Sequence, residues 1–154
     1  MSIRNKRMTT NVELEDYAKK HGINLNAVIT KDLLIEIKQK EGGYIINLGN
    51  SNTGGTHWVA LYLTHFPRES KNKKKYAFYF DSFGLPPPKE IYEYALKWTK
   101  SPIYIIENSK KIQALNSGFC GSYSILFIHN MDDKNNNPYQ NFSNYLKKFK
   151  LNKN

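Results

Sequence analysis

The spacing of apolar positions divides the chain into helical and extended segments. Apolar spacing and capping residues predict helices over 12–21, 31–41, 89–99, a segment that begins at residue 120, and 138–150. We expect Asn11 to cap the first helix at its N-terminus and Gly22 to end it. The apolar run after residue 120 is too continuous for a surface helix, so this helix is predicted to be buried.

Runs rich in β-branched and aromatic residues predict strands over 43–49, 57–66, 74–83 and 102–107. A short lysine-rich segment joins the second and third runs, which predicts a hairpin. Helices and strands together predict an α+β fold, with Cys120 at the N-terminal end of the most buried helix. The apolar content suffices for one core, so we expect one domain over 1–154, with 132–154 as a C-terminal loop and basic helix.

Composition and charge indicate the redox compartment and the kind of partner to expect. Cys120 is the only cysteine, so an internal disulfide is excluded and we expect a reducing compartment. The N-terminal segment is basic and polar and no long apolar run follows, so we expect neither secretion nor a membrane partner. The formal net charge of +10 and the pI of about 9.6 favour polyanionic partners, nucleic acid above all.

The position of Cys120 has two explanations. The N-terminus of a helix favours thiolate over thiol, and the flanking Gly118 and Gly121 would let a substrate backbone approach the sulfur closely. Free cysteine is also among the most buried residue types, and a small core residue is the ordinary explanation of such a side chain. Taken alone, the cysteine favours the core explanation.

Two further residues favour a chemical role for Cys120. His57 follows Gly54 and Gly55 at the start of a predicted strand, so we expect its imidazole at the sheet edge, where it could act as general base. Asp81 ends the next strand and would accept the Nδ1 proton of His57 if the two strands are hairpin neighbours. A turn-forming aspartate is the alternative explanation.

Gln113, which lies shortly before Cys120, carries a neutral amide donor of the kind that can hold an oxyanion, although most glutamines are merely solvated. The remaining histidines have structural explanations in a helix terminus, a surface loop and the buried helix. No spacing of histidine or cysteine is typical of a metal site, so we predict none.

The order GGTHW, then FDSFG, then Q-x6-C-G resembles the adenovirus-type maturation cysteine proteases and, more distantly, the proteases of SUMO and ubiquitin-like proteins. The similarity runs from about Asn11 to Met131. It implies a central mixed β-sheet flanked by helices. It also implies a role for each of four side chains, namely a nucleophile, a general base, its orienting acid and an oxyanion donor: Cys120, His57, Asp81 and Gln113.

The chain also departs from the family it resembles. The adenovirus branch carries glutamate where Asp81 stands, and its activating peptide docks through a disulfide to a second cysteine, which this chain lacks. The resemblance therefore implies no cofactor beyond stimulation by DNA or by a noncovalently bound peptide. It further implies cleavage after small residues, particularly glycine, in a narrow groove framed by Gly54, Gly55, Trp58 and Gly118.

The resemblance implies a viral cysteine endopeptidase that cleaves capsid or virion precursor proteins during maturation. We expect a monomer located in the virion and in the viral factory of the host cytoplasm. The composition, rich in Lys, Asn, Ile and Tyr, is typical of virophages and related DNA viruses or mobile elements. Two alternatives stay open: an isopeptidase that removes SUMO or ubiquitin-like modifiers, and a non-enzymatic basic protein that binds nucleic acid or capsid on a protease scaffold.

Overall fold

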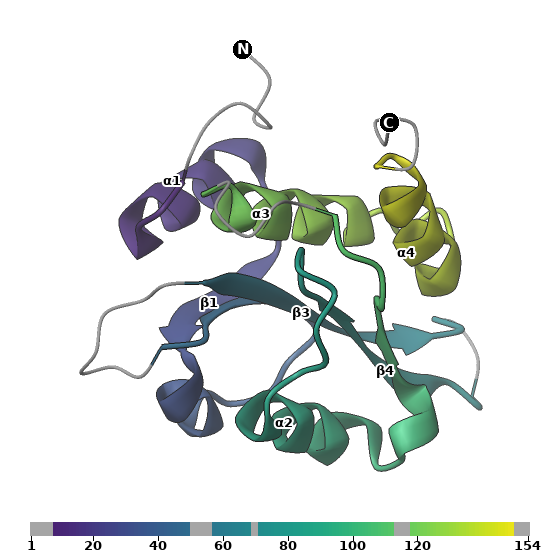
Figure 1. Ribbon diagram of the computed structural model, residues 1–154. Helices are drawn as coiled ribbons and strands as arrows, with labels where there is room; N and C mark the ends of the chain where they lie inside the picture. The colour runs from purple at the N-terminus through teal and green to yellow at the C-terminus, as the bar shows by residue number, and fades with distance from the viewer. Residues whose placement is uncertain (1–7, 50–56, 69–70, 113–117, 150–154) are drawn as a thin grey trace.

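A computed structural model describes residues 8–49, 57–68, 71–112 and 118–149 of the chain (Figure 1). One mixed sheet runs through it in the strand order β1 (Leu25–Thr30), β2 (Gly42–Asn47), β3 (Trp58–Phe66), β4 (Lys74–Phe80), β5 (Ile105–Glu107). The three inner strands pair antiparallel, and β1 and β5 pair parallel with their neighbours. The β3–β4 pair is the predicted hairpin.

Helices cover both faces of this sheet (Figure 1). One face carries α1 (Asn11–His21), α3 (Cys120–Met131) and α4 (Pro138–Lys147), and the other carries α2 (Lys89–Thr99) and the 3₁₀ helix η2 (Lys31–Glu36). Successive side chains of a strand point to opposite faces. Phe78 and Phe80 accordingly join the core beneath α3, whereas Ala77 and Tyr79 join the core above α2. The predicted α+β fold, with a mixed sheet flanked by helices, is confirmed.

The buried helix, α3, forms as predicted, and α2 has the predicted bounds. The helix predicted over 31–41 is wrong beyond Glu36, because the 3₁₀ turn ends there and the chain then runs extended into β2. Of its apolar residues Leu34 is fully buried, but Ile35 is 75% exposed, so no continuous apolar face exists to hold a longer helix against the sheet.

Other elements also differ from the prediction, and the strand predicted over 74–83 ends at Phe80. Thr10, not Asn11, caps α1, because its hydroxyl accepts the Glu13 N–H while the Glu13 carboxylate accepts the Thr10 N–H. The first half of the strand predicted over 102–107 is a 3₁₀ turn that begins at Pro102. Helix α4 ends earlier than predicted, at Lys147. Strand β1 was not predicted, because its six residues are all half-buried and show no alternation of burial.

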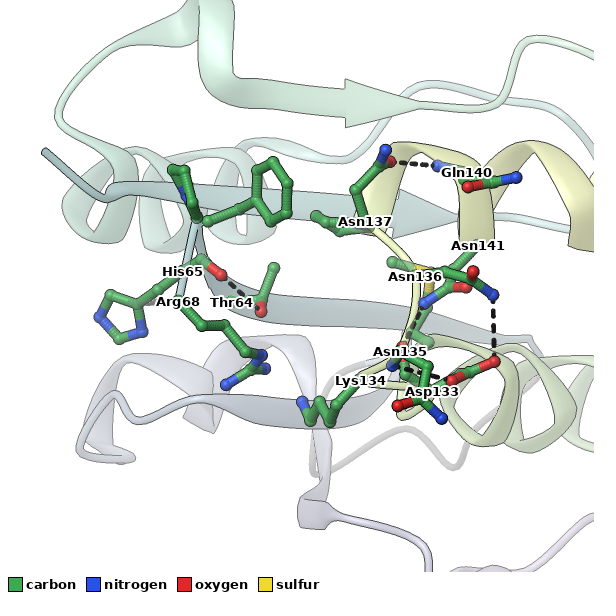
Figure 2. Close-up of a pocket in the computed structure, with 14 residues that line it drawn as sticks. Thr64, His65, Arg68, Asp133, Lys134, Asn135, Asn136, Asn137, Gln140 and Asn141 are labelled. Atoms are coloured by element: carbon green, nitrogen blue, oxygen red, sulfur yellow. Dashed lines mark hydrogen bonds between the residues drawn. The ribbon is translucent and has the colours of Figure 1, made fainter. Parts of the chain in front are cut away.

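A polar pocket lies at the end of β3 that is remote from Cys120 (Figure 2). The pocket measures about 610 Å³, and residues 64–68 together with residues of the α3–α4 connection line it. Beside it, the Glu41 carboxylate accepts hydrogen bonds from the Thr64 hydroxyl at 2.6 Å, the His65 N–H at 3.1 Å and the Arg68 guanidinium at 3.0 Å. Glu41 thereby ties the start of β2 to the end of β3.

Burial opposes the charged form of Glu41, but the Thr64 and His65 hydrogen bonds and the nearby Lys134 and Arg68 outweigh it and lower its pKa to about 2. Because this folded pKa lies below the unfolded value, the carboxylate stabilises the fold above the unfolded pKa. That contribution is lost as the pH falls through the folded pKa.

We expect Glu41→Gln to lower the free energy of unfolding at neutral pH by about 1–2 kcal/mol, since the charged acceptor is lost. The difference from the unchanged protein should shrink as the pH falls towards about 3. Urea denaturation over this pH range measures both quantities. Glu93→Gln is the control, because it breaks an exposed pair with Lys89 and should cost only a few tenths of a kcal/mol. A difference that does not vary with pH would contradict the electrostatic explanation.

Candidate active site

Cys120 is the first residue of α3 and lies against the start of the middle strand, β3. Its Sγ accepts a hydrogen bond from the Trp58 backbone N–H at 3.3 Å. His57 directly precedes Trp58, so the imidazole lies at the end of an inner strand. This is the predicted edge of the sheet, where the strands end, although β3 itself is an inner strand flanked by β2 and β4.

The β3–β4 pairing brings His57 and Asp81 together. Ala60 lies opposite Phe80, so Asp81, which follows β4, lies close to the start of β3. His57 Nε2 is 2.6 Å from Asp81 Oδ1, and both residues are buried. The prediction that Asp81 takes the Nδ1 proton is wrong. With Nε2 engaged by Asp81, Nδ1 is the nitrogen left for the thiol, and it is buried without a hydrogen-bond partner among the described residues.

The electrostatics of the site favour an imidazolium–thiolate pair. Burial disfavours a charged His57, but Asp81 and the Cys120 sulfur outweigh it and raise the pKa of His57 to about 9. Burial likewise disfavours a charged Cys120, but His57 and the Trp58 and Gly121 N–H groups lower the pKa of the thiol below its usual value. The N-terminal end of α3 adds partial positive charge at the sulfur. These groups therefore favour the thiolate form of the sulfur.

A tight turn after β4 fixes Asp81. The Phe83 N–H donates to Asp81 Oδ1 at 2.9 Å, and the Gly84 N–H donates to the Asp81 carbonyl at 2.8 Å. The Asn108 amide brackets the same residue, since its Oδ1 accepts the Asp81 N–H at 2.9 Å and its Nδ2 donates to the Asp81 carbonyl at 2.7 Å. We name the segment Asp81–Gly84 the acid turn.

Sequence reasoning missed Phe83 and Asn108. The motif FDSFG contains Phe83 two positions after the acid and before a turn glycine, so a signal for its place in the turn was present. Asn108 follows a strand of only three residues and carries no local signal. Its role depends on the long-range pairing of β4 with β5, which the sequence does not display.

The chain's own N-terminal segment packs against the start of α3. The Trp58 indole donates to the Thr9 carbonyl at 3.2 Å, and Met8 is buried. A Cβ on Gly121 would collide with the Met8 carbonyl, so this glycine makes room for the chain itself. The predicted reason for Gly121, close approach of a substrate, is therefore replaced by a packing reason.

The other predicted site residues divide into two groups. Gly54, Gly55 and Gln113 lie outside the described residues. Gly118 is exposed, has φ of 74° and lies two residues before Cys120. Trp58 is half-buried, and its N–H contacts the Cys120 sulfur. A cavity of about 470 Å³ adjoins Trp58 and is lined by residues 9–11, Val28, Ile29, Thr30, Leu33 and Asn47.

Within the ranges that the structure describes, no three side chains of the metal-binding types gather into a cluster. A search of the same ranges for a helix with the length and apolar character needed to cross a bilayer finds none.

Comparisons with known proteins agree with this geometry. A family model described as adenovirus endoprotease matches residues 35–150. The proteases of Bovine adenovirus C serotype 10 and Bovine adenovirus 2 are each 28% identical to this chain, over 117 and 102 residues, which is 68% and 60% of it. These stretches are 55% and 46% of the relatives, so the chain spans about half the length of the curated relatives it matches.

Two crystal structures of an ASFV protease match 93% of this chain and 64% of their own, with TM-scores of 0.59 and 0.55. At 16% and 19% sequence identity this likeness shows the fold alone. The chain therefore shares its fold with this ASFV protease.

Because Cys120 is the only cysteine, alkylation reports on it alone. We expect iodoacetamide to react with it well below the pH at which an ordinary thiol ionises, and the rate to change again near pH 9, where His57 loses its proton. His57→Ala should restore an ordinary thiol and lower the rate at mildly acidic pH by about tenfold or more. His129→Ala is the control, because His129 is an exposed residue in the last turn of α3. Equal profiles for all three proteins would contradict the ion pair.

Gly84→Ala tests the acid turn against a matched glycine. Gly84 has φ of +72°, and a Cβ there would lie 2.8 Å from the Lys110 and Lys111 backbone, whereas Gly22 has φ of +63° and open space. Gly22→Ala should cost about 1 kcal/mol, from the left-handed conformation alone. Gly84→Ala should cost more and should also slow Cys120 alkylation at acidic pH. Denaturation and alkylation of both variants measure this, and equal costs would contradict it.

Proposed function

Because the chain belongs to the adenovirus endoprotease family, we propose that it is a cysteine protease in which Cys120 is the nucleophile and His57 the general base. The observation that carries the proposal is the convergence of three side chains from separate elements: the thiol that begins α3, the imidazole before β3, and the carboxylate after β4. The orienting acid is Asp81.

The proposed reaction begins from the ion pair. The Cys120 thiolate attacks the carbonyl carbon of the scissile bond, and its oxygen becomes an oxyanion that the Cys120 N–H and the Gln113 side chain stabilise. Protonated His57 gives its proton to the leaving amine, which departs and leaves an acyl-enzyme. Neutral His57 then takes a proton from water, the hydroxide attacks the acyl carbon, and the thiolate and the new carboxyl end of the peptide separate.

The cavity that adjoins Trp58 would receive an extended peptide substrate. The 470 Å³ cavity begins at Trp58, whose N–H touches the sulfur, and continues across the ends of β1 and β2 past Thr30 and Asn47. Gly54, Gly55 and Gly118, which lack side chains, would let the substrate backbone approach closely at the cut.

The proposed substrates are capsid or virion precursor proteins, cut after glycine-containing motifs. The support is the similarity to two adenovirus proteases. Action as a monomer, in the virion and in the host cytoplasm, belongs to the same proposal, as does a source among virophages or related DNA viruses.

A stimulating partner is also part of the proposal. The net charge of +10 favours DNA, whose phosphates would draw the protein to substrates held on it. A peptide activator would have to bind noncovalently, because the one cysteine is the nucleophile.

We expect purified protein to cut capsid-derived peptides after glycine, and Cys120→Ala to abolish cutting with the fold intact. Gln113→Ala should lower kcat by about 10²-fold, since one oxyanion donor is lost. His129→Ala should leave the rate unchanged. Mass spectrometry of a peptide library, with and without DNA at several salt concentrations, measures the cuts and their partner dependence.

A SUMO- or ubiquitin-like conjugate in the same assay separates the alternatives. Faster release of the modifier than of any capsid peptide would indicate an isopeptidase. DNA binding that survives Cys120→Ala, with no cleavage of any substrate, would contradict the enzyme and leave the basic binding protein on a protease scaffold.

A further inference from the structure

The aromatic ring of Phe83 lies flat on the imidazole of His57. The ring centroids are 4.0 Å apart and the two planes differ by 5°. Asp81 meets the edge of the same imidazole through Nε2, and the thiol is left with Nδ1. One face of the candidate base is therefore covered by a π system, a contact that plays no part in the reaction proposed above.

Phe83 holds both partners of the buried pair. Its N–H donates to Asp81 Oδ1 at 2.9 Å, and this same oxygen is 2.6 Å from His57 Nε2. The backbone of Phe83 thus fixes the carboxylate while its side chain fixes the plane of the imidazole. The acid turn that presents it is itself held by Asn108 and by the Ile112 N–H, which donates to the Ser82 carbonyl at 2.7 Å.

Core packing does not account for this placement. Phe83 belongs to neither of the two hydrophobic cores formed by the described residues, and it remains half-buried at the end of the acid turn. Leu85, which directly follows the acid turn, is 56% exposed, so this apolar side chain is not drawn into the core either. The specific contact of the Phe83 ring is the one with His57.

We propose that Phe83 is a positioning residue, which keeps the His57 ring in line with Asp81 and Cys120 and stabilises its protonated form. This inference rests on the proposed function and adds a residue to its site. The face of an aromatic ring attracts a cation, and it does so more strongly where water is excluded. The ring also keeps water from one face of the imidazole, which strengthens the hydrogen bond to Asp81.

The test compares Phe83→Leu with Phe83→Tyr. Leucine fills a similar space without a π face, whereas tyrosine keeps the face. In Phe83→Leu we expect the upper transition of the alkylation rate to occur at a pH lower by about half to one unit. Alkylation at acidic pH should be slower by about three- to tenfold. Phe83→Tyr should stay near the unchanged protein. In peptide cleavage Phe83→Leu should lower kcat and leave KM unchanged.

Two further proteins separate positioning from packing. Leu85→Ala loosens the same connection without touching the stack and should leave the alkylation profile unchanged. Pentafluorophenylalanine placed at position 83 keeps the ring and reverses the charge distribution of its face, so it should shift the upper transition even if Phe83→Leu does not fold. Denaturation of every variant records its stability.

The outcomes are distinct. A lowered stability with an unchanged alkylation profile for Phe83→Leu, or no shift with the fluorinated ring, would overturn the role of Phe83 and leave the protease intact. Absence of low-pH thiolate reactivity in the unchanged protein would overturn the ion pair itself, and both proposals with it. Direct titration of the His57 ring by NMR should show its pKa lower in Phe83→Leu than in Phe83→Tyr.

Discussion

The site depends on one buried hydrogen bond, the 2.6 Å contact between His57 Nε2 and Asp81 Oδ1. Because Asp81 occupies Nε2, the other ring nitrogen is left for Cys120, and the raised pKa of His57 and the lowered pKa of the thiol both follow from this orientation. The hydrogen bond is itself a product of strand register. A shift of β4 by one residue against β3 would turn Asp81 to the other face of the sheet.

A buried carboxylate is costly unless other groups compensate it. Here the His57 ring and the Phe83 N–H compensate Oδ1, and Asn108, which follows β5, holds the Asp81 backbone on both sides. The segment from Asn108 to Ile112 therefore connects the acid to the stretch that contains Gln113.

The sequence predicted the features that depend on residues close together in the chain, and it did not predict those that depend on distant segments. Local patterns predicted α2, α3 and the β3–β4 hairpin. The order of the motifs predicted that His57, Asp81 and Cys120 would lie together. Thr10 was missed as a cap although its partner Glu13 stands at the required spacing, so the signal was present and was misassigned. The half-buried β1, the choice of Nε2 and the clamp by Asn108 depend on pairings between distant segments. These have no local signature.

The spacing of thiol and base is set by a helix fixed to a strand at both ends. At one end of α3, Cys120 accepts the Trp58 N–H. Just beyond the other end, the Asp132 carboxylate accepts the Tyr62 hydroxyl at 2.7 Å and the Asn24 N–H at 2.8 Å. Trp58 and Tyr62 are about 13 Å apart along β3, and α3 is about 17 Å long, so helix and strand are of similar length between these ties. The Cys120 thiol is therefore held by two packed elements, an arrangement that would keep it aligned with His57 before any substrate binds.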